Sequence, residues 1–314
     1  MTDNEIDNKA LPVASANTRC GFVALVGAPN AGKSTLMNSL VGTKVSIVTH
    51  KAQTTRSQIR GVVTEGEGQV VFIDTPGIFA PKRRLDRAMV DAAWTGAGDA
   101  DFVALIVDAE RGITPELEAL LEGLEKVPHD KVLVLNKVDL IKREMLLGLS
   151  ERLNAALRFQ RTFMISALKG DGVKDFLDWC LTRIPLGPWH FPEDQLTDLT
   201  LAITAAEVTR EKLFLRIHEE IPYNATVETE KFTINKDGSY RIDQVVYVTR
   251  DGHKKIVLGA GGQTIKAIGA ESRKELMEIF EVPVHLFLFV KVREKWGDDP
   301  ERYREMGLEY PQGK

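Results

Sequence analysis

A glycine-rich segment near the start of the chain carries residue types that can hold phosphate groups. It follows the apolar run 22–26 and consists of Gly27, Ala28, Pro29, Asn30, Ala31, Gly32, Lys33 and Ser34. In such a loop the backbone N–H groups and the N-terminus of the next helix face phosphate oxygens. Lys33 can offer a cation to the β- and γ-phosphates, and Ser34 a hydroxyl to Mg²⁺. The position between a strand and a helix predicts a nucleoside triphosphate site rather than a chance glycine-rich turn.

A second motif ends the apolar run 70–73 and consists of Asp74, Thr75, Pro76, Gly77 and Ile78. Asp74 then lies at the carboxyl end of a strand, where its carboxylate can hold the water shell of Mg²⁺. The Gly77 N–H can contact the γ-phosphate. Alone, Asp-Thr-Pro-Gly is more often an ordinary turn, but its position one strand after the phosphate loop favours a functional role.

Two further motifs predict which base the site accepts. Each follows an apolar run, and they consist of Asn136, Lys137, Val138 and Asp139, and of Ser166, Ala167 and Leu168. The Asp139 carboxylate can accept both the N1–H and the N2 amino group of guanine, whereas adenine would leave this charge unpaired. The Ala167 N–H can donate to guanine O6. Asn-Lys-Val-Asp alone can equally be a helix N-cap, but its order with the other motifs predicts a guanine nucleotide site.

The spacing of apolar residues predicts the elements that position these motifs. Short β-branched runs, typical of strands buried on both faces, lie at 22–26, 69–74, 102–108, 131–136 and 161–165. Helical patterns lie between them, at 33–41, 89–97, 115–126, 143–158 and 173–183. The alternation predicts a three-layer α/β domain with a mostly parallel sheet over residues 21–184.

A second, smaller domain is predicted over residues 199–314, with a C-terminal tail. Prolines and a glycine make residues 185–198 an extended linker. The elements expected after it are a helix at 199–219, strands at 226–233 and 240–250, helices at 263–268 and 272–280, and a strand at 284–292. This α-β-β-α-α-β order predicts an α+β domain. Its Gly-x-x-Gly turn consists of Gly259, Ala260, Gly261 and Gly262.

At this point the chain resembles the translation-factor-like GTPases and, within them, the Era family. The matching motifs occur in order at 27–34, 51–56, 74–77, 136–139 and 166–168, and 190–198 resembles the family's interdomain segment. The second domain resembles a type II KH domain, an RNA-binding fold. The resemblance implies a P-loop GTPase domain that binds GTP and GDP with Mg²⁺ and hydrolyses GTP.

The resemblance also implies roles in hydrolysis. Residues 53–57 correspond to switch I, and either Thr54 or Thr55 is expected to close over Mg²⁺ and the γ-phosphate. Ile78 stands where Ras-like enzymes have a water-orienting glutamine, so that side-chain mechanism is absent. In related GTPases an asparagine at the position of Asn30 helps to hold a potassium ion in place of an arginine finger. The alternative is that Asn30 only stabilises the turn of the loop.

The KH resemblance implies that about four unpaired nucleotides bind between the Gly-x-x-Gly turn and an apolar groove. KH turns commonly carry a basic residue at the variable positions, whereas this chain has alanine and glycine there. Phosphate charge must then be met by Lys254, Lys255, Lys266, Arg273 and Lys274. By the same resemblance the RNA is the 3′ end region of 16S ribosomal RNA, and peripheral association with the inner membrane is a further implication.

Composition limits the remaining alternatives. The chain has 314 residues, of which 43% are hydrophobic and 27% charged. Its net charge of -4 gives no reason to expect that it binds DNA. Its two cysteines, Cys20 and Cys180, form no disulfide or metal-binding pattern. Residues 1–20 are expected to be a loose tail without a signal sequence, and no apolar run is long enough to span a membrane. We expect a cytoplasmic monomer.

The sequence therefore predicts a GTP-hydrolysing, RNA-binding switch that assists assembly of the 30S subunit. One alternative is a related GTPase that acts on tRNA or on the large subunit, although a single GTPase domain followed by a KH-like domain matches neither arrangement. A second alternative is a non-catalytic RNA-binding adaptor that uses GTP only for stability.

Overall fold

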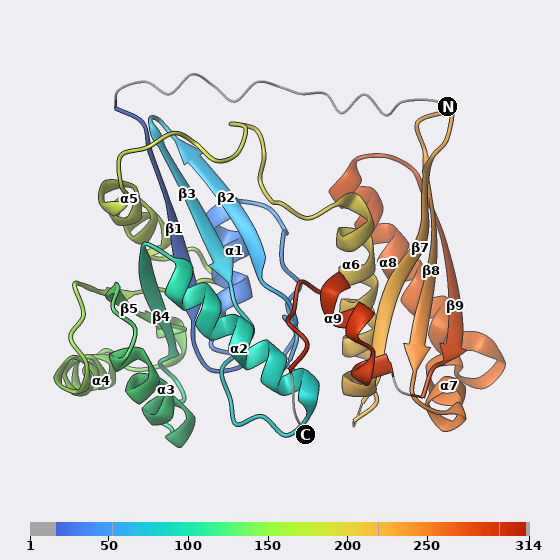
Figure 1. Cartoon of the computed structure of the whole chain (residues 1–314), viewed down its shortest axis with the longest axis horizontal. Coiled ribbons are helices and arrows are strands. Elements are labelled where there is room, and N and C mark those ends of the chain that lie inside the picture. The colour runs from blue at the N-terminus through green and yellow to red at the C-terminus, as the bar shows by residue number, and fades with distance from the viewer. Residues whose placement is uncertain (1–16, 52, 219, 295, 312–314) are drawn as a thin grey trace.

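The computed structural model describes residues 17–51, 53–218, 220–294 and 296–311. Within these ranges two domains lie side by side, and the chain crosses from the first to the second at one end of the molecule (Figure 1). Most of the expected tail, residues 1–20, lies outside the described residues. The first strand begins at Arg19, slightly before the predicted start of the domain, because Arg19 and Cys20 pair with Gly68 and Gln69.

The first domain is built on a six-stranded sheet of order β2-β3-β1-β4-β5-β6. Its strands are β1 (Arg19–Val26), β2 (Ile59–Glu65), β3 (Gly68–Asp74), β4 (Phe102–Asp108), β5 (Asp130–Asn136) and β6 (Thr162–Met164). β2 runs antiparallel to β3, and the other neighbouring pairs are parallel. The five predicted strands are confirmed. β2 was not predicted, because its Arg60-Gly61 pair interrupts the apolar run and an edge strand needs no apolar residues on both faces.

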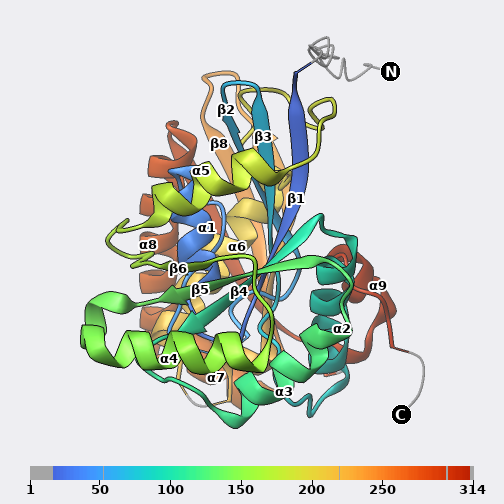
Figure 2. The same ribbon diagram turned by 90° about the vertical axis from the view of Figure 1, so that its left-hand side faces the viewer.

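Helices cover both faces of this sheet and make it a three-layer domain (Figure 2). α1 (Lys33–Val41) and α5 (Val173–Arg183) pack on one face, and α2 (Arg84–Asp99), α3 (Pro115–Glu125) and α4 (Arg143–Ala156) pack on the other. Alternate side chains of β1 pack on opposite faces of the sheet. Val23 and Leu25 belong to the core with α1 and α5, whereas Ala24 and Val26 belong to the core with α2 to α4. Burial on both faces explains why these strands are apolar throughout.

The predicted linker at 185–198 runs along the first domain. The side chain of Gln69, which is fully buried, donates to the Phe191 carbonyl over 2.9 Å and accepts from the His190 and Phe191 N–H groups. Thr197 then forms an isolated bridge with Gly61 of β2. The linker is therefore anchored to the sheet rather than free between the domains.

The second domain packs helices against a three-stranded sheet of order β7-β8-β9. Its elements in chain order are α6 (Leu201–Arg216), β7 (Ala225–Ile234), β8 (Tyr240–Val248), α7 (Asp251–Leu258), α8 (Gln263–Phe280) and β9 (Val284–Val292). β8 pairs antiparallel with β7 and parallel with β9. The predicted α-β-β-α-α-β order is confirmed.

The positions of its two middle helices were predicted wrongly. The predicted helices at 263–268 and 272–280 are one continuous helix, α8, and the other helix is α7, which ends just before the Gly-x-x-Gly turn. Gly269 suggested a break, but one glycine inside a helix costs only about 1 kcal/mol. Leu288 of β9 packs close to Gly269, and this contact favours a continuous helix there.

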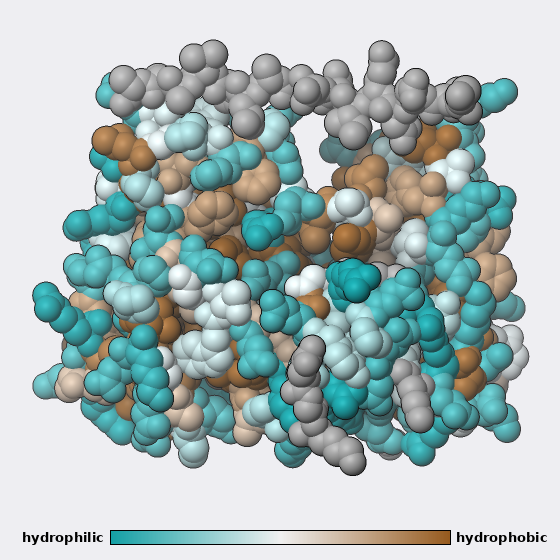
Figure 3. Space-filling model, in the orientation of Figure 1, coloured by the Kyte–Doolittle hydropathy of each residue, from teal (hydrophilic) through white to brown (hydrophobic). Residues whose placement is uncertain are grey.

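The C-terminal segment joins the two domains. After β9 comes the helix α9 (Pro300–Glu305), and Trp296, Tyr303 and Leu308 pack against Leu85 and Met89 of α2. The predicted C-terminal tail is therefore largely part of the folded core. On the face shown in Figure 3, hydrophobic side chains appear as small areas among predominantly hydrophilic ones. Among the described residues, no helix has the length and hydropathy needed to cross a bilayer.

Candidate functional site

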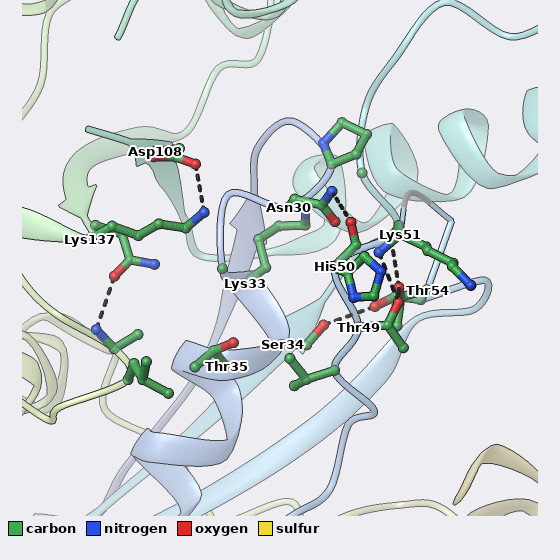
Figure 4. Close-up of a pocket in the computed structure, with 18 of the residues that line it drawn as sticks. Asn30, Lys33, Ser34, Thr35, Thr49, His50, Lys51, Thr54, Asp108 and Lys137 are labelled. Carbon is green, nitrogen blue, oxygen red and sulfur yellow. Dashed lines mark hydrogen bonds and ion pairs between the residues drawn. The ribbon is translucent and has the colours of Figure 1, made fainter. Parts of the chain in front are cut away.

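A cavity of about 680 Å³ opens at the carboxyl ends of the parallel strands of the first domain. The phosphate loop forms its floor, and the α1–β2 loop (residues 42–58, of which 52 lies outside the described ones) forms one wall (Figure 4). Open α/β sheets place ligands at this edge because every strand delivers its following loop there. The cavity therefore lies where the sequence motifs predicted it.

The predicted site residues divide into two groups. Those that line the cavity are Pro29, Asn30, Gly32, Lys33, Ser34, Thr54, Thr55, Gly77, Asn136, Lys137, Asp139, Ser166, Ala167 and Leu168. Those that do not are Gly27, Ala28, Ala31, Asp74, Thr75, Pro76, Ile78 and Val138. In the second group, Asp74 lies directly beneath the floor, whereas the Ile78 side chain is buried in the core with α2 to α4. Ile78 is therefore part of the hydrophobic core rather than of the cavity wall.

Lys33 is held inside the phosphate loop. Its side chain is buried, and its Nζ donates to the carbonyls of Gly27 and Ala28 over 3.1 Å each. Burial lowers the pKa of Lys33 to about 8, against the opposing effect of the Asp74 carboxylate. Gly32, which caps α1, has a φ of 96°, and a Cβ there would lie 2.2 Å from Asn136 Nδ2. Glycine is thus required by both backbone angle and space.

Oxygen atoms of four side chains gather beneath the phosphate loop. Asp74 Oδ2 accepts from Ser34 Oγ at 2.7 Å, from Ser46 Oγ at 2.8 Å and from Thr55 Oγ1 at 3.3 Å, and Ser34 Oγ lies 2.9 Å from Thr55 Oγ1. Adjacent ligands of an octahedral Mg²⁺ lie about 3 Å apart, given bonds of about 2.1 Å. Asp74 Oδ1 is buried, and none of the residues that the structure describes hydrogen-bonds to it. Hard oxygen donors at this spacing, with one unpaired carboxylate oxygen, fit Mg²⁺.

The two threonines of the α1–β2 loop have different positions. Thr55 is buried and points to Ser34 and Asp74. The Thr54 hydroxyl instead donates to the Lys51 carbonyl over 2.8 Å and contacts the Thr49 hydroxyl at 2.6 Å. The sequence left both threonines open, and the geometry places only Thr55 at the oxygen cluster.

Asn136 joins the phosphate loop to the loop after β6. Its Nδ2 donates to the Ala31 carbonyl over 2.9 Å, and its Oδ1 accepts from the Ala167 N–H over 3.0 Å. The motif predicts that this Ala167 N–H donates to guanine O6, whereas in the structure it has an acceptor within the protein. The Asn136 side chain is thus a brace between two loops, and Ala167 is placed by it.

The acidic and basic groups at the base-binding end are paired. Lys137 Nζ donates to Asp108 Oδ2 over 2.6 Å, and Lys169 Nζ lies 3.4 Å from Asp139 Oδ2. A hydrogen bond from the Ser166 hydroxyl is the main cause that lowers the pKa of Asp139. Asp139 therefore presents an ionised carboxylate at neutral pH, which is an acceptor-only group.

Asn30 connects the phosphate loop to the α1–β2 loop. It has a φ of 64°, and its Nδ2 donates to the His50 carbonyl over 2.8 Å (Figure 4). The sequence also allows an Asn30 side chain that only stabilises the turn of its own loop. The observed contact is different, because His50 belongs to the opposite wall of the cavity.

Several cavity residues were not predicted. They are Thr35, Ile47, Val48, Thr49, His50, Lys51, Asp108, Glu110, Arg111 and Leu140, whereas Gln53 belongs to the predicted switch I segment. Asp108 was predictable, because it ends the strand β4 at the same sheet edge as the known motifs. The wall formed by residues 47–51 has no such signal, since its position depends on contacts with the second domain.

The Gly-x-x-Gly turn lies on the surface between α7 and α8. Gly259, Gly261 and Gly262 all have positive φ, at 72°, 57° and 78°. The Gly262 N–H donates to the Gly259 carbonyl over 3.2 Å, which closes the turn. The turn therefore presents backbone rather than side chains, as close approach of a nucleic-acid backbone would require.

An apolar groove of about 340 Å³ begins beside this turn, between α8 and β9. It is lined by Ile265, Lys266, Gly269, Ala270, Arg273, Leu286 and Leu288. Of the predicted basic residues, Lys266 and Arg273 lie on this groove. Lys274 is exposed on another side of α8, and Lys254 and Lys255 lie on α7. The structure thus brings two of the five predicted cations to the groove.

Comparisons with known proteins agree with both domains. A family model described as a 50S ribosome-binding GTPase matches residues 22–137, and a KH domain model matches residues 220–297. The chain is 61% identical to the GTPase Era of Rhizobium meliloti over 311 residues, which is 99% of this chain and 98% of that protein. It is 59% identical to the GTPase Era of Agrobacterium fabrum over 318 residues, which covers 100% and 99% of the two chains. The chain belongs to the Era family.

Solved structures of Era proteins have the same two-domain fold. A variant of Aquifex aeolicus Era bound to GDP and AlF4⁻ is 36% identical, with a TM-score of 0.87 over 92% of this chain and 99% of the other. Era in complex with MgGDPNP and nucleotides 1506–1542 of 16S ribosomal RNA is 37% identical, with the same TM-score and coverage. The present Era-family chain is therefore a GTPase, with a P-loop GTPase domain followed by a KH domain.

Proposed function

We propose that this GTPase is an RNA-binding switch that acts on the 3′ end region of 16S ribosomal RNA and assists assembly of the 30S subunit in the cytoplasm. The observation that carries the proposal is the pairing of a nucleotide cavity with a Gly-x-x-Gly turn beside a groove that has cations at its rim. The related Era complex with 16S ribosomal RNA supports the choice of RNA.

The phosphate loop is proposed to bind GTP and GDP. Its N–H groups and the N-terminus of α1 face the phosphates, and Lys33 exchanges its two loop carbonyls for phosphate oxygens. Ser34 and Thr55 hold Mg²⁺, and the Asp74 carboxylate holds the ion's water shell beneath them. The ion supplies charge neutralisation between the β- and γ-phosphates. The Gly77 N–H contacts the γ-phosphate.

Guanine is proposed to bind between the loops after β5 and β6. The Asp139 carboxylate accepts from the N1–H and N2 amino groups of the base, and the Lys169 ammonium lies 3.4 Å from that carboxylate. Leu140 and Leu168, which are exposed apolar side chains at the rim of the cavity, cover the ring faces. A base without these two donors would leave the carboxylate without its partners.

Hydrolysis is proposed to use a potassium ion rather than a side-chain glutamine. The residue after Gly77 is Ile78, which is buried in the core and offers no polar group to water. Asn30 Nδ2 donates to the His50 carbonyl of the opposite wall, which places the Asn30 amide at the edge of the phosphate loop where a cation beside the phosphates would be held. A monovalent cation there stabilises charge that develops on the phosphates in the transition state.

RNA is proposed to bind to the groove with its backbone against the Gly-x-x-Gly turn. Phosphates approach the N–H groups of Gly259 to Gly262, and bases enter the apolar groove beside Ile265 and Leu288. Lys266 and Arg273 meet the charge at the rim, and Lys254, Lys255 and Lys274 add longer-range attraction.

Crosslinking in cells tests the choice of RNA. The full chain is crosslinked to RNA, and the fragments are sequenced for the wild type, for Lys266→Ala/Arg273→Ala, and for Lys142→Ala/Arg143→Ala, an exposed basic pair at the start of α4. We expect fragments from the 3′ end of 16S ribosomal RNA with the wild type and the α4 control, and about a tenfold loss with the groove pair.

Depletion of the protein should also increase the amount of unprocessed 16S precursor. Enrichment of tRNA or large-subunit RNA in the crosslinked fragments would overturn the proposal. Steady-state phosphate release by the purified chain, measured with and without RNA, separates a switch from an adaptor that only binds GTP.

A further inference from the structure

The α1–β2 loop lies along the second domain. Lys44 pairs with Glu211 of α6 at 2.6 Å, the Val48 N–H donates to Glu211 Oε1 over 2.9 Å, and Lys51 Nζ donates to carbonyls at the C-terminal end of α6. A cation at this end of a helix is stabilised by the helix dipole. The wall of the nucleotide cavity is thus fixed by α6 as well as by the first domain.

The second domain also contacts the residues on both sides of Thr55. Its predecessor, Thr54, accepts a hydrogen bond at its carbonyl from Arg210 Nη2 of α6 over 2.6 Å. Its successor, Arg56, donates to the carbonyls of Pro222 and Ala225 over 3.0 and 2.9 Å. The peptide that carries Thr55 is therefore held at both ends by the second domain, while its hydroxyl reaches the oxygen cluster of the first.

Arg56 is enclosed by the second domain. Its guanidinium lies 5.5 Å from the ring centroids of Phe214 and of Trp296. Burial and the neighbouring Arg210 lower the pKa of Arg56 to about 9, so it stays charged at neutral pH. A charged side chain that gives two of its donors to carbonyls and its faces to two rings has little freedom to move.

Arg210 is oriented by its own domain. It is 2% exposed, its Nε donates to Glu207 Oε1 over 2.8 Å, and its guanidinium lies 5.3 Å from the ring centroid of Phe214. Its Nη1 is buried without a partner among the described residues. Removing the guanidinium would relieve its desolvation cost but leave Glu207 without this partner, and the Glu207 side chain is 21% exposed and so retains access to water.

A charged network extends these contacts to α8. Glu275 of α8 pairs with both Lys44 and Lys212, and Lys212 also pairs with Glu211 at 2.8 Å. α8 begins directly after the Gly-x-x-Gly turn. The loop that positions Thr55 and the helix that borders the RNA groove therefore share one set of ion pairs.

We propose that Arg210 of α6 in the second domain is a positioning residue for GTP hydrolysis, which holds the Thr54 carbonyl and so presents Thr55 to the Mg²⁺ site. The inference rests on the role proposed above for Thr55. The second domain then completes the catalytic site in addition to binding RNA. Displacing a reacting group by about 1 Å costs on the order of 10²-fold in rate, whereas the phosphate loop and Asp139 hold GDP without Arg210.

The test compares Arg210→Ala and Arg210→Lys with Arg216→Ala in the full chain. Arg216 lies on the same helix and pairs with Glu271 of its own domain over 2.9 Å. Steady-state hydrolysis at saturating Mg²⁺ and GTP, GDP affinity and thermal unfolding are measured for each variant. We expect kcat to fall about 10- to 100-fold for Arg210→Ala and less for Arg210→Lys. GDP affinity should stay within about twofold, and Arg216→Ala should behave as the wild type.

Hydrogen exchange of the backbone amides at 53–57, with a GTP analogue bound, is the second measurement. We expect faster exchange in the Arg210 variants than in the Arg216 control. Unchanged kcat in folded Arg210→Ala and Arg210→Lys would overturn the inference. A fall in kcat that is accompanied by a comparable fall in GDP affinity and by a lower melting temperature would also overturn it. If Arg210→Ala does not fold, Arg210→Lys alone decides. Thr55→Ala with wild-type hydrolysis would instead overturn the proposed role of Thr55.

Discussion

The nucleotide cavity and the Gly-x-x-Gly surface hold their polar groups in opposite ways. Lys33, Thr55, Asp74, Asn136 and Ser166 are all buried. Most of their hydrogen bonds are to one another or to nearby backbone. On the second domain, by contrast, the predicted cations are mostly exposed on α7 and α8. A buried polar group that loses its partner costs free energy, whereas an exposed cation contributes modestly and is screened by salt. Substitutions should therefore have large, specific effects in the first region and smaller, salt-dependent effects in the second.

Asp139→Asn should give the largest effect and tests the base specificity of the nucleotide cavity. The amide offers a donor where guanine also has donors, so GTP affinity should fall by roughly 10⁴-fold, because a site built to hydrogen-bond its substrate discriminates at that level. Xanthine has a C2 carbonyl that accepts from the new amide, so XTP should bind instead. Competition between GTP and XTP measures the change. Unchanged preference for GTP would show that Asp139 does not read the base.

Asn30→Ala tests whether the exposed edge of the cavity takes part in hydrolysis. If Asn30 holds a potassium ion, hydrolysis in potassium should exceed that in sodium by about 10²-fold at equal ionic strength, because the cation stabilises charge that develops only in the transition state. The variant should lose this difference and keep its GDP affinity. Equal rates of the wild type in both salts would leave the His50 contact as the role of Asn30.

The contrast between local motifs and long-range contacts explains which parts of the structure could be predicted from the sequence. The cavity motifs are contiguous residues that follow apolar strands, so a local pattern is enough to place Ser34, Asp74 and Asp139 at one sheet edge. β2 was missed because its pairing depends on β3 rather than on its own periodicity. Thr54 and Thr55 were indistinguishable for a similar reason, since their orientation is set by Arg210, 156 residues away along the chain.

Long-range contacts also account for other differences between the predictions and the structure. The division of 263–280 into two helices followed the local propensity of Gly269, which packing against β9 overrides. The motif predicts that the Ala167 N–H donates to the base, and in the structure its acceptor is Asn136. The sequence named five cations for the groove without separating them, and the fold of α8 brings only Lys266 and Arg273 to it.

Gly262→Asp tests the exposed region. The turn has a φ of 78° at this residue, and a Cβ would meet only the Lys266 Cε at 4.0 Å, so space is available. A carboxylate there should lower the affinity for single-stranded ribosomal RNA about tenfold and reduce its salt dependence, because fewer phosphates are engaged. Gly262→Asn is the matched control, since asparagine also tolerates a positive φ but is uncharged. Intrinsic GTP hydrolysis should stay near the wild-type rate. If both variants bind RNA as the wild type does, the turn is not the clamp.

Glu211→Gln tests the connection between the two regions and should give the smallest effect. Burial alone would raise the pKa of Glu211, but hydrogen bonds from Lys212, Lys44 and the Val48 N–H outweigh it, and the pKa lies below its ordinary value of 4.5. The stabilisation is therefore complete above pH 4.5 and is lost as the pH falls through the folded pKa. At neutral pH the variant should lose about 1–2 kcal/mol of unfolding free energy. Below pH 4.5 the difference between the two proteins should shrink, because the wild-type carboxyl also becomes neutral. Urea unfolding at a series of pH values measures this difference in unfolding free energy. A difference that is constant with pH would mean that the charge of Glu211 does not hold the α1–β2 loop against α6.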